Sequence, residues 1–94
     1  MSNSILYALV ARGRNVLAEY TDMGGNFTTV TRVLLAKIPQ ETDCRMSYVY
    51  DKHIFHYCVD TGIVFMCMCE ESTKRRSAFS FLDDLMSSWR LKYA

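Results

Sequence analysis

The chain has 94 residues, of which 50% are hydrophobic and 13% aromatic, and it contains a single proline. Such a length fits one domain, and such a composition excludes a disordered or collagen-like chain. The formal net charge is +1, from 11 Lys and Arg against 10 Asp and Glu, so the basic excess typical of nucleic-acid-binding proteins is missing. We therefore expect one compact domain, over residues 1–94, that does not bind nucleic acid.

The first half of the chain predicts two strands followed by a helix. Residues 5–11 are continuously apolar, as in a strand that is covered on both faces. Gly13 allows a tight turn, after which residues 16–20 return as a second strand. Asn26 is a suitable N-cap for a helix, because its side-chain oxygen can accept a backbone N–H of the first turn. Pro39 ends that helix, since it disfavours helical geometry in the residue before it.

The predicted first helix carries an apolar stripe with two further apolar residues beside it. The stripe recurs at three- and four-residue spacing and comprises Phe27, Val30, Leu34 and Ile38. Val33 and Leu35 fall on its two flanks. Two interpretations remain open: a wide core stripe with one exposed leucine, or a flank that lines a groove for a partner.

The second half of the chain predicts three strands. The first covers residues 46–50, which alternate in character. The second covers residues 53–59, and the third, residues 63–69, is apolar at every position, so it should be central and buried on both faces. Side chains on one face of the first of these strands are Met46, Tyr48 and Tyr50.

A long helix is predicted at the end of the chain, with Ser72 or Thr73 as its cap. Its apolar face comprises Ala78, Phe79, Leu82, Leu85, Met86 and Trp89. The order of elements is therefore two strands, a helix, three strands and a helix. This order indicates an α+β domain in which helices cover a single antiparallel sheet.

Motifs and residue groups that carry enzyme chemistry are missing from the sequence. It has no Gly-x-Ser-x-Gly elbow, P-loop or Gly-x-Gly-x-x-Gly motif. Asp83 and Asp84 are adjacent on a helix, about 100° apart, and cannot act as a pair. His53 and His56 point to opposite faces of a strand, and the cysteines near them are interpreted as buried small hydrophobes: Cys58, Cys67 and Cys69. We expect no catalytic residues, no metal and no cofactor.

Compartment and membrane signals are also missing. The N-terminus lacks the basic region, apolar core and cleavage site of a signal peptide. No apolar run approaches the roughly 18–20 residues that a membrane span requires. We therefore expect a soluble chain in a reducing compartment, with free thiols at Cys44 and the other three cysteines.

Five short motifs follow one another in a distinctive order between residues 5 and 93. They are Val10-Ala-Arg-Gly13, Gly24-Gly-Asn-Phe27, Ala36-Lys-Ile-Pro39, Phe55-His-Tyr57 and Arg76-Ser-Ala-Phe-Ser-Phe-Leu82. In this order and spacing they resemble the longin domain of vesicle R-SNAREs, over almost the whole chain. The resemblance implies a profilin-like fold, with a five-stranded antiparallel sheet in the order 2-1-5-4-3 and helices on both faces.

The resemblance also implies a partner-binding groove between the first helix and the third strand. In longin domains this groove takes the protein's own SNARE motif, which autoinhibits the protein, or sorting and adaptor proteins. The family's hydrophobic-x-Tyr pair matches Met46 and Tyr48, and the matching helix residues are Val30, Val33 and Leu34. Such a groove is physically reasonable, because an edge strand has unpaired N–H and C=O groups that an added peptide can use.

Further parts of the family's proteins are expected outside residues 1–94. They are a final short helix, the SNARE heptads and a C-terminal membrane anchor, which would hold the domain at the cytosolic face of endosomal, lysosomal or secretory vesicles. Where that final helix does not cover the sheet, we expect a tendency to self-associate. Two other functions stay open: a longin-like scaffold subunit of an adaptor or tethering complex, and a hydrolase or redox protein with a reactive cysteine.

Overall fold

A computed structural model describes residues 5–21, 27–50 and 52–93. Within them the chain forms β1 (Ile5–Arg12), β2 (Asn15–Thr21), α1 (Phe27–Lys37), β3 (Cys44–Tyr50), β4 (His53–Asp60), β5 (Ile63–Glu70) and α2 (Arg75–Tyr93). This is the order of elements that the sequence predicts, and each strand is one or two residues longer than its predicted segment. The predicted cap of the first helix, Asn26, lies outside the described residues.

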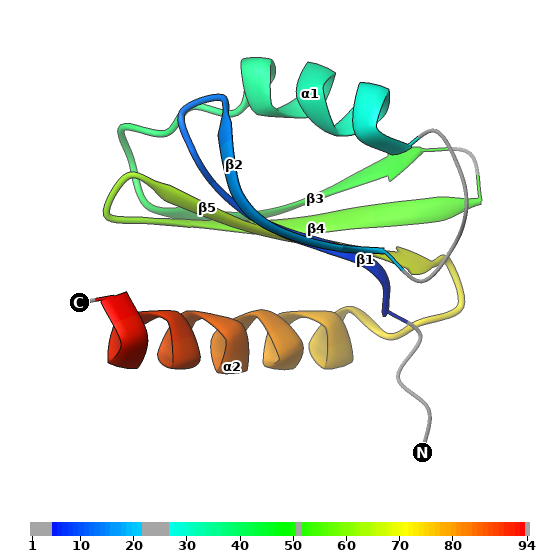
Figure 1. The fold of residues 1–94 in the computed structure, drawn as a ribbon. Coiled ribbons are helices and arrows are strands. Elements are labelled where there is room, and N and C mark those ends of the chain that lie inside the picture. The colour runs from blue at the N-terminus through cyan, green and yellow to red at the C-terminus, as the bar shows by residue number, and fades with distance from the viewer. Residues whose placement is uncertain (1–4, 22–26, 51, 94) are drawn as a thin grey trace.

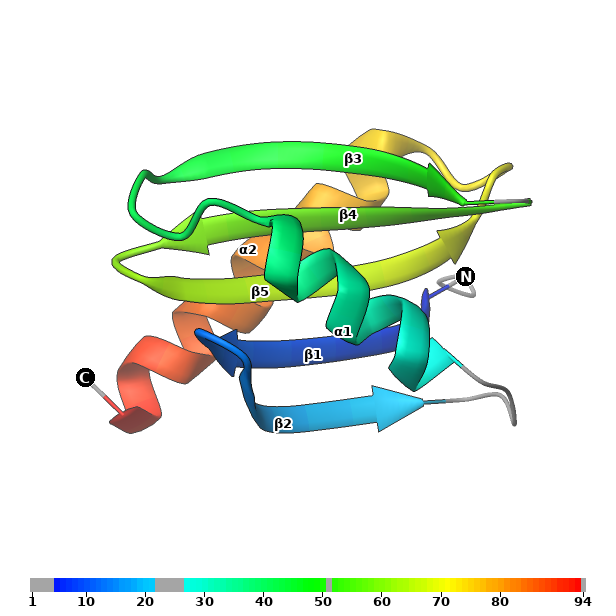
Figure 2. The same ribbon diagram turned by 90° about the horizontal axis from the view of Figure 1, so that it is seen from above.

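The five strands form one antiparallel sheet in the order β2-β1-β5-β4-β3 (Figure 2), which confirms the expected order. The central strand β5 is buried from Val64 to Cys69. It lies between β1 and β4 and is covered on both faces, which explains why its sequence shows no alternation of apolar and polar residues. β2 and β3 form the two edges of the sheet.

The two helices lie on opposite faces of the sheet (Figure 1). α1 packs on a core that comprises Tyr7, Leu9, Ala11, Leu34, Leu35, Ile38, Phe55, Tyr57, Val59, Val64, Met66 and Met68. α2 packs on a second core that comprises Ile5, Ala8, Val10, Cys58, Phe65, Cys67, Cys69, Ala78, Phe79, Leu82 and Met86. The predicted apolar face of the final helix is confirmed, with Leu85 and Trp89 at its half-buried margin. In the described parts of the chain, no helix has the length and apolar character needed to cross a membrane.

The exposed residue beside the stripe of α1 is a valine and not a leucine. Leu35 is buried in the core beneath α1, whereas the side chain of Val33 is 50% exposed. The expectation of one exposed leucine was therefore wrong. The orientation of α1 about its own axis decides which flank is buried, and contacts with the sheet set this orientation.

The start of α2 also differs from the prediction. The carbonyl of Lys74 accepts the N–H groups of Ser77 and Ala78, at 3.0 and 3.2 Å, so Lys74 occupies the cap position and the helix begins at Arg75. The N–H of Thr73 instead bonds the carbonyl of Glu70 in a turn that follows β5. This turn places the predicted caps, Ser72 and Thr73, before the helix.

Candidate functional site

The α1-facing side of the edge strand β3 carries exposed apolar side chains. Met46 lies opposite Tyr57 of β4, and Tyr48 lies opposite Phe55. Both partners on β4 belong to the core beneath α1, so Met46 and Tyr48 lie on the same face of the sheet as α1. Met46 is 50% exposed and Tyr48 42% exposed. Two of the five predicted groove residues are therefore at the surface of an edge strand, on the predicted face.

The other face of β3 makes polar contacts toward α2. The guanidinium of Arg45 lies 2.6 Å from a carboxylate oxygen of Asp83 on α2. The hydroxyl of Ser47 lies 2.8 Å from Nδ1 of His56 on β4. The alternation of β3 thus gives a face that carries Met46 and Tyr48 and an opposite face on which Arg45 and Ser47 contact α2 and β4.

The three helix residues of the predicted groove occupy three different environments. Val33 is half exposed, Val30 is partly buried against the core, and Leu34 is 4% exposed within that core. Val33 is therefore the one of the three whose side chain offers a large free surface. Leu34 supports α1 from below, because its side chain packs between the helix and the sheet.

Tyr50 shares the exposed face of β3 but was not among the predicted groove residues. Its side chain is 42% exposed, and its ring makes an edge contact with Phe55, with 6.3 Å between the ring centroids. The alternation of residues 46–50 already placed Tyr50 with Met46 and Tyr48. That signal alone could have added it to the site.

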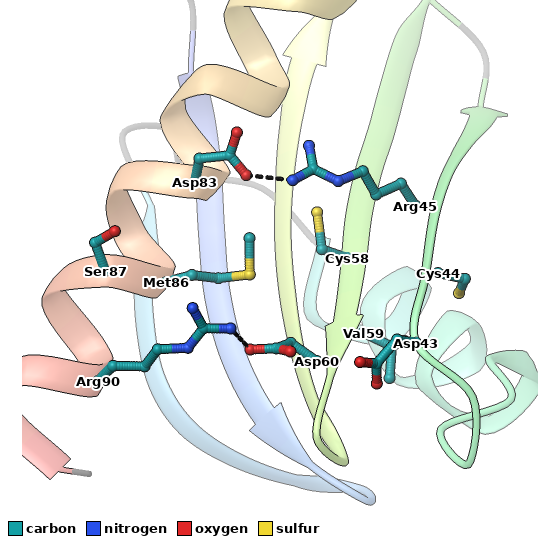
Figure 3. Close-up of a pocket in the computed structure, with 10 residues that line it drawn as sticks. All are labelled: Asp43, Cys44, Arg45, Cys58, Val59, Asp60, Asp83, Met86, Ser87 and Arg90. Atoms are coloured by element: carbon teal, nitrogen blue, oxygen red, sulfur yellow. Dashed lines mark hydrogen bonds and ion pairs between the residues drawn. The ribbon is translucent and has the colours of Figure 1, made fainter.

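On the opposite face, a cavity of about 530 Å³ lies between α2 and the β3–β4 pair (Figure 3). Two ion pairs span it, Arg45 with Asp83 and Arg90 with Asp60. Its other lining residues are Asp43, Cys44, Cys58, Val59, Met86 and Ser87. In this cavity each arginine is paired with a carboxylate, so its chemistry is that of a contact between helix and sheet.

Two of the three buried thiols, Cys58 and Cys67, are poorly suited to nucleophilic chemistry. Burial raises the pKa of the Cys58 thiol. A hydrogen bond with Cys69 and then burial raise the pKa of Cys67. At neutral pH these two thiols are protonated, whereas the attacking species in cysteine catalysis is the thiolate. Among the residues the structure describes, His, Cys, Asp and Glu do not gather in a group of three or more that could hold a metal ion.

Known proteins with similar sequences indicate the family of this chain. The family model described as a regulated-SNARE-like domain, the longin domain, matches residues 17–94. Vesicle-associated membrane protein 7B of Dictyostelium discoideum is 49% identical over 89 residues, which cover 95% of this chain and 34% of that protein. Vesicle-associated membrane protein 711 of Arabidopsis thaliana is 43% identical over 82 residues, which cover 87% of this chain and 37% of that protein.

A mammalian protein is similar as well. Vesicle-associated membrane protein 7 of Mus musculus is 39% identical over 90 residues, which cover 96% of this chain and 40% of that protein. The chain thus spans between 34% and 40% of the length of these three relatives. The sheet order, the two covering helices, the match to the family model and these identities agree with one another: the chain belongs to the longin family of regulated-SNARE-like domains.

Proposed function

We propose that this chain is the regulatory binding domain of a vesicle R-SNARE in membrane trafficking and fusion. In this proposal the groove between α1 and β3 binds the protein's own SNARE motif, which autoinhibits the protein, or a segment of a sorting or adaptor protein in its place. The domain acts at the cytosolic face of endosomal, lysosomal or secretory vesicles. It acts by binding and not by catalysis.

The observation that carries the proposal is the exposed face of an edge strand. Met46 and Tyr48 are exposed on the α1-facing side of β3, and Val33 is exposed on α1. A peptide added beside β3 would gain main-chain hydrogen bonds along the strand and bury these side chains at the same time. Aromatic side chains such as Tyr48 are enriched at the centres of protein interfaces, because they bury a large area at little cost in conformational entropy.

The names of the relatives support the biological setting. The three relatives described above are called vesicle-associated membrane proteins, in an amoeba, a plant and a mammal. Their similarity to this chain covers between 87% and 96% of its length. A role at vesicle membranes is therefore the setting in which we place the groove.

The proposal is tested by NMR titration of the isotope-labelled domain with an R-SNARE heptad peptide. We expect chemical-shift changes that cluster on α1 and β3, and we expect Met46→Ser with Tyr48→Ser to abolish them. Both side chains are only about half buried and lie on an edge strand, so the double variant should keep the domain folded, with a melting temperature close to that of the wild type.

A matched control is available on the same strand. Val49 is 67% exposed and precedes Tyr50 on β3, where alternation places it on the face opposite Met46 and Tyr48. Val49→Ser should therefore leave peptide binding unchanged. Loss of binding in both variants, or no shift changes in the wild type, would contradict the groove. Shift changes along α2 would favour instead the scaffold subunit of an adaptor or tethering complex.

A further inference from the structure

The segment of residues 38–43 joins the two walls of the proposed groove. The N–H of Ile38 bonds the carbonyl of Leu34 at 3.0 Å and completes the last turn of α1, and β3 begins at Cys44. This connection therefore leaves one wall and enters the other within six residues. Its attachment to the sheet fixes where α1 ends and where β3 starts.

Gln40 attaches this connection to the turn between β1 and β2. Its side-chain oxygen accepts the N–H of Gly13 at 2.8 Å, and its side-chain nitrogen donates to the carbonyl of Gly13 at 2.9 Å. The amide of Gln40 thus pairs with both backbone groups of one residue, as a neighbouring strand does in a ladder. Gly13 has a φ of 63°, a conformation that glycine adopts without a steric penalty.

Asp43 attaches the same connection to a second turn. Its carboxylate accepts the N–H of Thr61 at 3.0 Å, and Thr61 lies in the turn between β4 and β5 with a φ of 53°. Both turns are at the same end of the sheet, where α1 also ends (Figure 1). Two side chains three residues apart therefore hold the connection across both hairpins.

The apolar contacts of α1 set which of its faces is buried, and the hydrogen bonds of Gln40 and Asp43 add directional constraints at its end. The helix packs on the sheet through Leu34, Leu35 and Ile38, and it crosses the strands diagonally (Figure 2). Hydrophobic contact is non-directional, so it allows small sliding and rotation of a helix on a sheet. Hydrogen bonds are directional and lose strength steeply when donor and acceptor are displaced.

We infer that Gln40 and Asp43 are positioning residues for the groove. Together they hold the end of α1 and the start of β3 at a fixed separation, so that a peptide meets walls that are already in place. The expected effect on peptide affinity rests on the proposed function. The geometric part, a fixed orientation of α1 relative to the strands, is independent of any partner.

The geometric part is tested with residual dipolar couplings of backbone amides in solution. In the wild type, the couplings of α1 should fit the alignment tensor determined from β1, β4 and β5. In Gln40→Ala with Asp43→Ala, we expect the strand couplings to fit a common tensor still and those of α1 to deviate from it. Couplings of α1 that fit equally well in the double variant would overturn the inference.

The binding part is tested by measuring the affinity for the R-SNARE heptad peptide. If the double variant holds its walls correctly in only about a tenth of its molecules, the apparent Kd rises about tenfold, because affinity scales with the competent fraction. Glu41→Ala is the matched control, since Glu41 is exposed and lies between the two positioning residues. Equal losses in the control and the double variant would overturn the inference.

Milder variants separate positioning from folding. Asp43→Asn keeps an oxygen that can accept the Thr61 N–H, and we expect it to retain wild-type couplings and affinity. Gln40→Glu keeps the size of the side chain but places an oxygen against the Gly13 carbonyl. We expect this variant to lose both the wild-type couplings of α1 and the wild-type affinity for the peptide. A wild type that binds no peptide would defeat the proposed function, while the couplings would still decide whether Gln40 and Asp43 position α1.

Discussion

His56 is a buried histidine on the α2 face of the sheet. Its Nδ1 lies 2.8 Å from the Ser47 hydroxyl, and its ring makes an edge contact with Phe79, with 5.4 Å between the centroids. Its Nε2 is buried without a hydrogen-bond partner among the described residues. Burial, and then the positive charge of Arg75, lower the pKa of His56. The native state therefore favours the neutral ring.

This shift makes the free energy of unfolding depend on pH. As the pH falls through about 6.5, the unfolded chain takes up a proton on this histidine, and the folded chain does so only at lower pH. The contribution of neutral His56 to the free energy of unfolding is thus fully present above about pH 6.5 and is lost as the pH falls below it. Urea unfolding at pH 7.5 and 5.5 should show a smaller loss of stability in His56→Gln than in the wild type.

The control is His53→Gln, which removes the other histidine of β4. His56→Gln should alter the pH dependence of the free energy of unfolding more than His53→Gln does. Parallel pH profiles for the wild type and His56→Gln would show that His56 is not responsible.

The buried side chain of Phe65 contributes to the stability of the core. It is fully buried on β5, opposite Val10 of β1 and Cys58 of β4, and its ring lies 6.5 Å from that of Trp89. Phe65→Ala should cost about 3–5 kcal/mol. This is a large part of the roughly 5–15 kcal/mol that stabilises a typical domain.

Thermal and urea unfolding measure this effect directly. We expect Phe65→Ala to unfold the domain or to lower its midpoint sharply. Leu91→Ala serves as the control, because Leu91 on α2 is 90% exposed and its truncation should leave the midpoint unchanged. Equal midpoints for wild type and Phe65→Ala would mean that β5 is not the centre of the core.

The helix α2 is held to the sheet by its apolar face, and its ion pair with Arg45 adds little. The Arg45–Asp83 pair has side chains that are about half exposed, and water and salt screen such pairs. Leu82, the residue before Asp83, is completely buried. The two neighbours therefore allow a direct comparison of apolar and ionic contributions.

Leu82→Ala should destabilise the domain by about 2–5 kcal/mol. Asp83→Ala should change the stability by at most about 1 kcal/mol, and added salt should reduce that difference further. Urea unfolding of both variants at low and high salt measures these values. An Asp83→Ala effect as large as that of Leu82→Ala would show that the ion pair, and not packing, anchors α2.

The sequence predicted the strands and helices well because their apolar residues follow clear periodicities. The apolar run of β5 indicated a central strand, and the stripe of α2 indicated its buried face. The cap of α2 was misplaced because Ser72 and Thr73 are favoured at both caps and turns. The prediction that a leucine is the exposed residue beside the stripe of α1 was also wrong. Val33 and Leu35 are both apolar, and only the packing of the helix distinguishes them.

The candidate site could be predicted from the sequence less completely than the fold. Alternation placed Met46 and Tyr48 on one face of a strand, but the exposure of that face depends on where α1 crosses the sheet. Leu34 matched the family's groove by position, although its side chain lies in the core. Gln40 and Asp43 gave no periodic signal, because their contacts join residues 27 and 18 positions apart in the chain.

For the whole molecule, the accessibility of the thiols is a test of the folded state. Cys58, Cys67 and Cys69 are buried, and Cys44 is only partly buried. A thiol-specific reagent should react with one cysteine of the native domain much faster than with the other three. Denaturant should then expose all four equally, because none is in a disulfide.

A chromogenic disulfide reagent measures both phases in one experiment, and Cys44→Ser should remove the fast phase. A fast phase that remains in Cys44→Ser would place a reactive thiol elsewhere and revive the hydrolase or redox interpretation. Such a thiol would need a lowered pKa and access to solvent.

The position of β5 has a consequence for the synthesis of the chain. β5 pairs with β1 on one side and with β4 on the other, so among the described strands the pairs β1–β2 and β3–β4 are joined into one sheet through β5. A nascent chain that has not yet reached residue 70 therefore holds two separate hairpins, each with an apolar face exposed to water. The sheet closes late in translation, when the strand that connects both hairpins has left the ribosome, and until then the unfinished chain is most exposed to aggregation.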